Sequence, residues 1–167
     1  MVWGNADTPK DAKTAIDFGA EGIGLCRTEH MFLGDRAILV RKMILAKSDQ
    51  ERDEALEKLR EIQTQDFIEI FKAMSGFPTI IRLIDPPLHE FLPEYDHLLE
   101  RVTILKTRKE LGAPYDEKEL AEQEELLAKT KAMKESNPMI GQRGVRLCLI
   151  IPGLVKMQIT AIMEGAC

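Results

Sequence analysis

The chain has 167 residues and a mass of 18.9 kDa, and its 44% hydrophobic and 31% charged residues are typical of one folded domain or a part of one. Its net charge is −5, from 23 basic and 28 acidic residues, which disfavours a non-specific nucleic-acid binder. No apolar run approaches the roughly 18 residues that span a bilayer, and no secretory leader opens the sequence, so we expect a cytoplasmic protein with neither a membrane nor a nucleic-acid partner.

The first segments predict a strand, a helix and a second strand. A short apolar piece at residues 2–5 is followed by Thr8 and Pro9, residue types that cap and begin a helix, and Gly19 is a natural stop for that helix. Residues 22–26 are apolar and predict a buried strand. The two glycines in this strand are too few and wrongly spaced for a phosphate-cradling loop, and they favour close packing.

The middle of the chain predicts long helices around a central strand. Residues 35–73 carry an apolar stripe at helical spacing, and polar residues 63–65 predict a break between two helices. Residues 79–84 are rich in β-branched side chains, as in a strand, and Asp85-Pro86-Pro87 must end it. Residues 94–135 predict polar helices that are interrupted near Gly112.

The last segments predict a turn at Asn137-Pro138, a fourth strand at residues 145–151 and a helix at residues 154–163. Buried strands that alternate with helices about four times indicate an α/β fold with a parallel sheet. A doubly wound sheet and part of a (β/α)8 barrel both fit this pattern. A complete barrel needs about 250 residues, so we expect at most a partial one.

Three arginines lie where the predicted strands begin or end. Arg27 follows the second strand, Arg82 lies inside the third, and Arg143 stands at the edge of the fourth. In parallel α/β proteins, ligands bind beyond the carboxyl ends of the strands. Arginine keeps its charge and offers a planar fork to carboxylate or phosphate, so the expected ligand is a small, highly charged anion. The alternative is that each arginine only forms a salt bridge.

Other polar side chains give weaker signals. The acidic residues near the arginines, Glu29, Asp85 and Glu90, are candidates for acid–base groups or metal ligands, but they equally fit a role in neutralising the arginines. None of the three histidines has metal-ligand spacing. The three cysteines are odd in number and far apart, so they predict neither a disulfide framework nor a zinc site, and they fit a reducing compartment.

Four segments resemble the barrel domain of the PEP-utilising enzymes, and within them the pyruvate, phosphate dikinase family. They are residues 5–9 (Asn-Ala-Asp-Thr-Pro), residues 20–32 with Cys-Arg-Thr-Glu-His, residues 82–93 with Asp-Pro-Pro-Leu-His-Glu-Phe, and residues 137–147 with Gly-Gln-Arg-Gly. The third segment favours the dikinases over phosphoenolpyruvate synthase and Enzyme I of the sugar phosphotransferase system. Met157-Gln158 fits the same alignment, and the resemblance covers essentially the whole chain.

This resemblance implies a phosphotransferase whose barrel binds phosphoenolpyruvate or pyruvate. It implies phosphoryl exchange with a histidine on a separate domain, which a third domain phosphorylates from ATP and phosphate. It also implies that Arg27 and Arg82 bind the substrate, and that Arg143 faces the transferred phosphoryl group. Phosphoryl transfer depends mainly on positioning and charge stabilisation, which arginines supply. Gln142 departs from the family, in which histidine is usual.

The resemblance further implies that the family's Mg²⁺ ligands, proton-donating cysteine, phosphohistidine domain and ATP-grasp domain have no match in residues 1–167. We therefore expect no catalytic and no metal-binding residue in this chain, and no turnover by it alone. The expected structure is the first half of a (β/α)8 barrel, with about four β/α units and long helical crossovers. The alternative is a non-catalytic anion-binding or self-assembling half-barrel. Open sheet edges predict a homodimer or larger oligomer.

Overall fold

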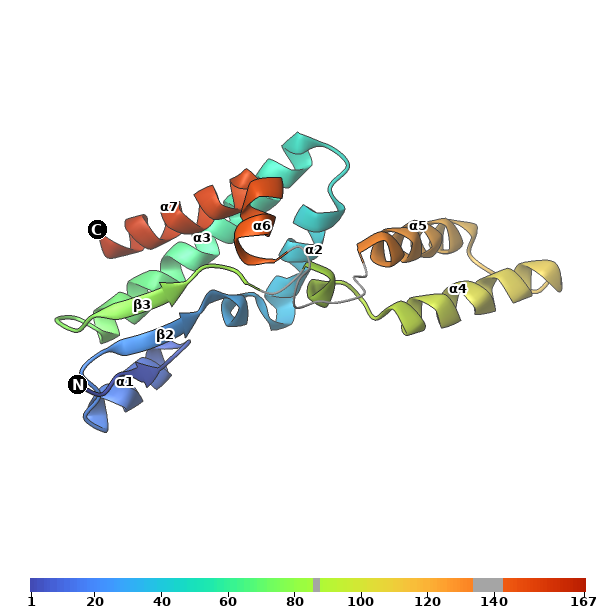
Figure 1. The fold of residues 1–167 in the computed structure, drawn as a ribbon. Helices are drawn as coiled ribbons and strands as arrows, with labels where there is room; N and C mark the ends of the chain where they lie inside the picture. The colour runs from blue at the N-terminus through green and yellow to red at the C-terminus, as the bar shows by residue number, and fades with distance from the viewer. Residues whose placement is uncertain (86–87, 134–142) are drawn as a thin grey trace. The chain divides into compact units, whose positions relative to one another are not determined.

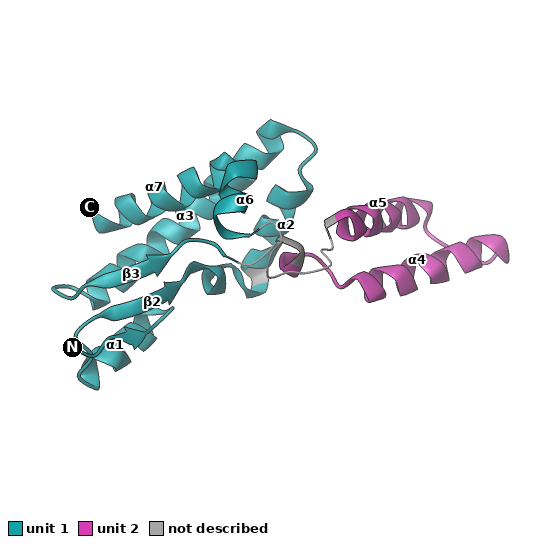
Figure 2. Cartoon of the chain, viewed as in Figure 1, with its two compact units in different colours: residues 1–87, 142–167 teal, residues 88–141 magenta. Residues whose placement is uncertain are grey.

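A computed structural model describes residues 1–85, 88–133 and 143–167, and the chain divides into two compact units. Unit 1 comprises residues 1–87 and 142–167, and unit 2 comprises residues 88–141 (Figure 2). The elements, labelled in Figure 1, are β1 (Gly4–Asn5), α1 (Pro9–Asp17), β2 (Ile23–Arg27), the 3-10 helices η1 (Thr28–Phe32) and η2 (Gly34–Arg36), α2 (Ala37–Leu45), α3 (Asp49–Ala73), β3 (Thr79–Arg82), the 3-10 helix η3 (Leu88–Phe91), α4 (Tyr95–Glu110), α5 (Glu117–Met133), α6 (Gly144–Ile150) and α7 (Pro152–Ala166).

The first helix begins and ends where the sequence predicts. The Thr8 hydroxyl oxygen accepts a hydrogen bond from the backbone N–H of Asp11 at 3.1 Å, and Pro9 occupies the first turn of α1. The helix ends at Asp17, and Gly19 follows with a φ of 89°, a conformation that favours glycine. The turn at Gly19 leads the chain from α1 into β2.

The sheet has three parallel strands in the order β1-β2-β3. The chain crosses from β2 to β3 through α2 and α3, as expected for an α/β fold. Close packing explains Gly22, just before β2, and Gly24 within it, because a Cβ atom on Gly22 would lie 2.9 Å from the backbone oxygen of Pro78 and one on Gly24 would lie 3.3 Å from the Cβ atom of Trp3. The sheet is compatible with part of an α/β barrel.

Helices α1, α3 and α7 form the core of unit 1 with the sheet. Figure 1 shows α3 and α7 side by side along one face of β3. The buried side chains of this core include Ile23 and Cys26 from β2, Phe67 and Ile70 from α3, and Ala161 from α7. The apolar stripe that predicted α3 therefore faces the sheet, as amphipathic helices do.

The predicted fourth strand is wrong, because residues 144–150 form helix α6. An apolar run of this length fits a strand or a helix equally well by periodicity. Only Leu147 of this helix is buried, whereas Val145 is 74% and Leu149 is 76% exposed. A strand buried on both faces would shield all of these side chains, but most of them are exposed. The segment therefore forms a helix that buries one face and contacts α7. The described residues thus hold three strands rather than four.

The helix break predicted at residues 63–65 is also misplaced. The chain breaks between α2 and α3, where the Ser48 hydroxyl oxygen accepts from the backbone N–H of Glu51 at 3.2 Å. Gln63 lies inside α3 and is fully buried. Ser48 thus begins α3, three residues after α2 ends at Leu45. Three polar residues inside an apolar stripe do not outweigh continuous helix packing.

Unit 2 is a helical hairpin. Its helices α4 and α5 pack through a small core of Val102, Leu105 and Leu120. Two ion pairs, Arg101–Glu119 and Lys106–Glu124, join the same helices at 2.5 and 2.7 Å. The predicted helices and their interruption near Gly112 are confirmed here. The predicted turn at Asn137-Pro138 lies outside the described residues.

Candidate anion-binding site

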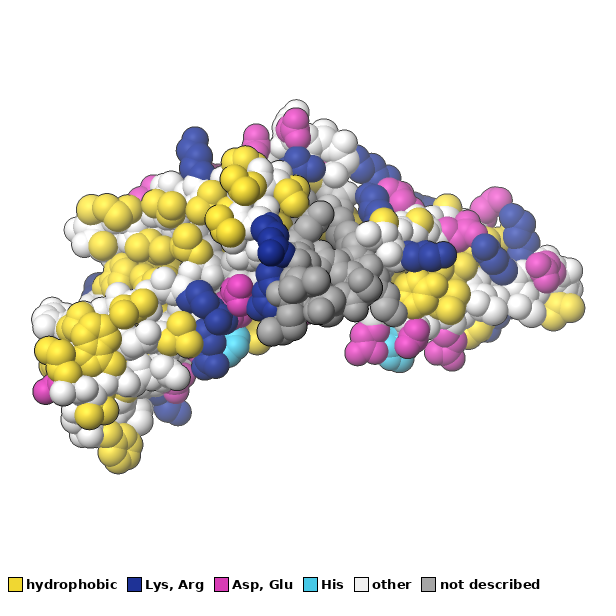
Figure 3. Space-filling model, in the orientation of Figure 1, with side chains coloured by type: hydrophobic (Ala, Val, Ile, Leu, Met, Phe, Trp, Pro, Cys, Tyr) yellow, Lys and Arg dark blue, Asp and Glu magenta, His cyan; other side chains and the backbone are white. Residues whose placement is uncertain are grey.

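The three arginines expected at strand ends lie in unit 1. Arg27 is the last residue of β2 and Arg82 the last of β3, and the two are paired across the parallel ladder. Arg143 directly precedes α6. Their side chains are 37%, 39% and 25% exposed, so all three are partly accessible to solvent. Figure 3 shows basic side chains gathered with acidic ones and a histidine on this face of unit 1.

Asp7 holds Arg27. The backbone N–H of Arg27 donates to Asp7 Oδ1 at 2.7 Å, and its Nε and Nη2 donate to Oδ2 at 2.9 and 2.6 Å. His30 Nδ1 lies 2.8 Å from the same Oδ2 atom. Asp7 follows β1, so the carboxyl ends of three neighbouring strands supply Asp7, Arg27 and Arg82.

The charge state of Asp7 follows from these contacts. Burial alone raises the pKa of the Asp7 carboxyl. The hydrogen bonds from the Arg27 side chain and backbone, together with the charges of Arg27 and His30, lower this pKa by more than burial raises it. The result is a pKa below the ordinary value of 3.8. The same ion pair raises the pKa of Arg27. Both groups are therefore charged at neutral pH.

Arg82 and Arg143 share an acidic partner. Arg82 Nη2 donates to Glu29, and its Nη1 lies 3.7 Å from Asp85 Oδ2. Arg143 Nη2 donates to the same Asp85 oxygen at 2.6 Å, and the backbone N–H of Gly144 donates to the Asp85 carbonyl at 3.3 Å. Two buried atoms of the first pair, Arg82 Nε and Glu29 Oε2, have no hydrogen-bond partner among the described residues. This pair therefore has unused hydrogen-bonding capacity at the strand end.

A buried polar chain supports the strand ends from behind. Gln158 of α7 accepts from the backbone N–H of Ile84 at 2.9 Å and donates to the Thr28 hydroxyl at 3.0 Å. Thr28 in turn donates to the backbone oxygen of Arg82 at 2.9 Å. Gln158 and Thr28 are both fully buried. These hydrogen bonds link α7 to the ends of β2 and β3, where Arg27 and Arg82 lie.

Sequence reasoning identified the arginines and two of their partners, Glu29 and Asp85. It gave no role to Asp7 or Gln158. A carboxylate directly after the first predicted strand was a usable signal for Asp7, because parallel strands place such residues at the same edge as Arg27. Gln158 matches the family resemblance through Met157-Gln158, but a glutamine within a predicted helix has no partner that sequence alone can name.

The other candidates do not join this site. Glu90 belongs to η3 of unit 2 and is exposed, and His97 pairs with Glu94 on α4 at 3.6 Å. Gln142 lies outside the described residues, and so does the side chain of His89. Cys26 is buried in the core, and burial raises the pKa of its thiol to about 12.

No group of three or more histidine, cysteine or acidic side chains within the described ranges is arranged to hold a metal ion. The residues present therefore do not fit the magnesium site that the resemblance implies for the family. No single described helix is long and apolar enough to cross a membrane, and α6 and α7, which meet that test only together, are bent by 111°.

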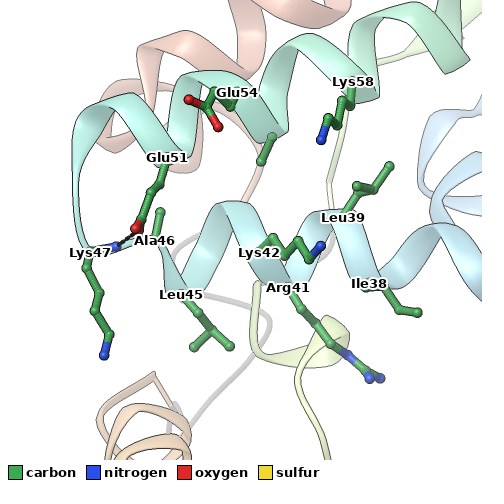
Figure 4. A pocket seen from close by; sticks show the side chains of 11 residues that line it. Ile38, Leu39, Arg41, Lys42, Leu45, Ala46, Lys47, Glu51, Glu54 and Lys58 are labelled. Carbon is green, nitrogen blue, oxygen red and sulfur yellow. Dashed lines mark hydrogen bonds between the residues drawn. The ribbon is translucent and has the colours of Figure 1, made fainter.

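One cavity lies apart from the three arginines. It has a volume of about 650 Å³ and lies between α2 and the first turns of α3 (Figure 4). Its walls mix apolar and charged side chains, including Leu39, Lys42, Glu54 and Lys58. None of the three arginines lines it.

A family model and individual relatives place the chain in the same family. A family model described as "PEP-utilising enzyme, PEP-binding domain" matches residues 1–167. The chain is 47% identical over 165 residues to pyruvate, phosphate dikinase from Entamoeba histolytica, 50% over 167 residues to pyruvate, phosphate dikinase 1, chloroplastic, from Oryza sativa subsp. japonica, and 47% over 163 residues to the dikinase from Rhizobium meliloti. These alignments cover 97–99% of this chain but only 16–18% of the relatives, about one sixth of their length.

Proposed function

Because this chain belongs to the PEP-utilising enzymes, as a part of their PEP-binding domain, we propose that its arginines bind phosphoenolpyruvate or pyruvate. In this proposal the chain is one half of the substrate barrel of a pyruvate, phosphate dikinase-type phosphotransferase. The relatives carry that name, and the chain matches about one sixth of their length. A cytoplasmic location stays a prediction.

The observation that carries the proposal is the pairing of Arg27 with Arg82 at the ends of adjacent strands. Phosphoenolpyruvate bears a phosphate and a carboxylate, and guanidinium groups bind both through paired hydrogen bonds. Arg143 is tied to Asp85, which also approaches Arg82, so a third guanidinium belongs to the same cluster. The three carboxylates that hold the arginines fix them before the anion arrives.

We further propose what these residues do in phosphoryl transfer. The bond between phosphorus and the enol oxygen breaks as phosphorus bonds to a histidine nitrogen on another domain, which leaves the enolate of pyruvate. Arg27, Arg82 and Arg143 hold the phosphate and carboxylate in line and offset the developing charge. Protonation of the enolate falls to a group outside this chain. Mg²⁺ is expected in the whole enzyme, but no step is assigned to it here, since the described residues form no such site.

Titration calorimetry with phosphoenolpyruvate tests the proposal. Hydrogen bonds to charged groups contribute about 1.5–3 kcal/mol each, so Arg82→Met should weaken binding roughly tenfold or more. Arg52→Met is the matched control, because Arg52 is 35% exposed against 39% for Arg82, and it pairs only with Asp49 within α3. Unchanged binding by a folded Arg82→Met protein would make the arginine cluster purely structural.

A second function, a self-assembling half-barrel, is favoured by a different observation. Val145, Leu149 and Ile150 of α6 are 74%, 76% and 55% exposed, and Ile80 on β3 is 52% exposed. Exposed apolar surface and unpaired sheet edges promote association, most often as a closed pair. We propose that the chain forms a homodimer through this apolar surface. Light scattering over a concentration series tests it, and a species of 18.9 kDa at high concentration would refute it.

A further inference from the structure

Asp7 occupies an unusual position for an acidic residue beside a site that is proposed to bind an anion. Its side chain is only 9% exposed and lies at the carboxyl end of β1, next to Arg27. The charge of a carboxylate at such a place repels a bound anion, so the position calls for a second role that offsets this repulsion. The geometry of its contacts indicates what that is.

The two oxygens of Asp7 tie the Arg27 side chain to the Arg27 backbone. Oδ1 accepts the backbone N–H at 2.7 Å, while Oδ2 accepts Nε at 2.9 Å and Nη2 at 2.6 Å. Three bonds from one residue to one carboxylate fix the torsions of a long, flexible side chain. Arg27 Nη1 has no hydrogen-bond partner among the described residues, and the Arg27 side chain is 37% exposed, so the outer edge of the guanidinium remains open to a ligand.

We infer that Asp7 is a positioning residue for anion binding, which holds the Arg27 guanidinium with its outer edge toward the ligand. The inference rests on the proposed function, because it gives Arg27 an anion to bind. Its distinguishing consequence is one of sign. A carboxylate that acts only through its charge weakens anion binding, so its removal tightens binding. A positioning carboxylate strengthens binding through Arg27, so its removal weakens binding.

A double-mutant cycle measures this consequence by titration with phosphoenolpyruvate. Asp7→Asn should weaken binding several-fold in the wild-type protein, but less than twofold when Arg27→Met is already present, since Asp7 acts through Arg27. Asp7→Glu keeps the charge but displaces the oxygens, and it should also weaken binding. Asp17→Asn, an equal charge change at an exposed site on α1, is the control and should leave binding unchanged. Thermal melts establish that each variant is folded.

Each outcome separates the inference from the function on which it rests. Tighter binding by Asp7→Asn, or an equal loss in both backgrounds, overturns the positioning role while the anion site stands. Equal binding by the wild type and Arg27→Met refutes the role of Arg27 in the proposed function instead.

A second measurement keeps the inference testable if binding by this chain is too weak to titrate. The Arg27 Nε–H signal in NMR spectra, assigned by its loss in Arg27→Lys, should exchange with solvent at least tenfold faster in Asp7→Asn. Unchanged exchange would show that Asp7 does not hold the guanidinium, which overturns the inference without any ligand.

Discussion

Replacing Gln158 by leucine should strongly destabilise unit 1. Leucine has nearly the same size, so the change removes hydrogen bonds and leaves the packing almost intact. The backbone N–H of Ile84, which is buried, loses the Gln158 oxygen that now accepts it at 2.9 Å. An unsatisfied buried donor costs about 1–3 kcal/mol, and loss of the bond to Thr28 costs about 1 kcal/mol more. We expect a total loss of about 2–4 kcal/mol.

The chain provides a control for this prediction in a second fully buried glutamine. The side-chain oxygen of Gln63 has no hydrogen-bond partner among the described residues, and its nitrogen contacts only Met31 Sδ at 3.7 Å. Gln63→Leu removes a buried polar group that is poorly satisfied already, so unfolding should become no easier. Two identical substitutions at two equally buried glutamines should therefore have different effects.

Urea unfolding followed by tryptophan fluorescence measures both variants. Trp3 is the single tryptophan and lies against β2, so its signal reports the unit that contains both glutamines. With a urea dependence of about 1–3 kcal/mol per molar, the Gln158→Leu midpoint should fall by about 1 M or more. A Gln158→Leu protein within about 0.5 kcal/mol of the wild type would refute the reasoning. An equal loss in Gln63→Leu would refute it as well.

Three further predictions follow from single contacts. The pKa of Asp7 is lower in the folded chain than its ordinary value of 3.8, so the charged carboxylate stabilises the fold at pH values above 3.8. In urea unfolding, Asp7→Asn should therefore be less stable than the wild type at neutral pH, and this difference should shrink as the pH falls below 3.8. Iodoacetamide at about pH 8 should label exposed Cys167 and spare Cys26, whose thiol pKa of about 12 leaves roughly one molecule in ten thousand ionised; mass spectrometry that finds both labelled equally contradicts this. Gly22→Ala should cost about 1–3 kcal/mol in thermal or urea unfolding, because the new Cβ would meet the Pro78 carbonyl oxygen at 2.9 Å, and a neutral result would mean that the strand shifts freely.

The elements that were predictable carry local signals. Thr8 and Pro9 mark the start of α1, because each restricts the backbone where it stands. The β-branched run marks β3, although this strand ends at Arg82, two residues earlier than the predicted end at residue 84. The sequence predicts a strand where α6 lies, because a short apolar run does not show which of its side chains are buried. That depends on the elements packed against it, and only Leu147 is buried here. The meeting of Arg27 and Arg82 was predictable because strand ends in parallel folds converge, whereas Arg143 precedes helix α6 and not the strand that the sequence predicts there.

The contacts of the site were not predictable in the same way. Asp7 meets Arg27 across 20 positions of sequence, and Gln158 meets Thr28 across 130. Both depend on which strand lies beside which and on where α7 packs. The type of a residue does not identify a partner that is far away in sequence unless the topology of the fold is already known.

The contact between Asp85 and the start of α6 has a consequence for the modular organisation of the chain. Asp85 and Arg143 are 58 positions apart, yet they are joined by an ion pair and by the adjacent backbone bond from Gly144. Unit 2 is thus inserted in the sequence of unit 1 between two residues, Asp85 and Arg143, that unit 1 holds together. Shortening the enclosed loop to about ten residues should lower its closure entropy cost by about 1.5 kcal/mol. A chain in which a short linker replaces the hairpin should then keep the ion pair between Asp85 and Arg143.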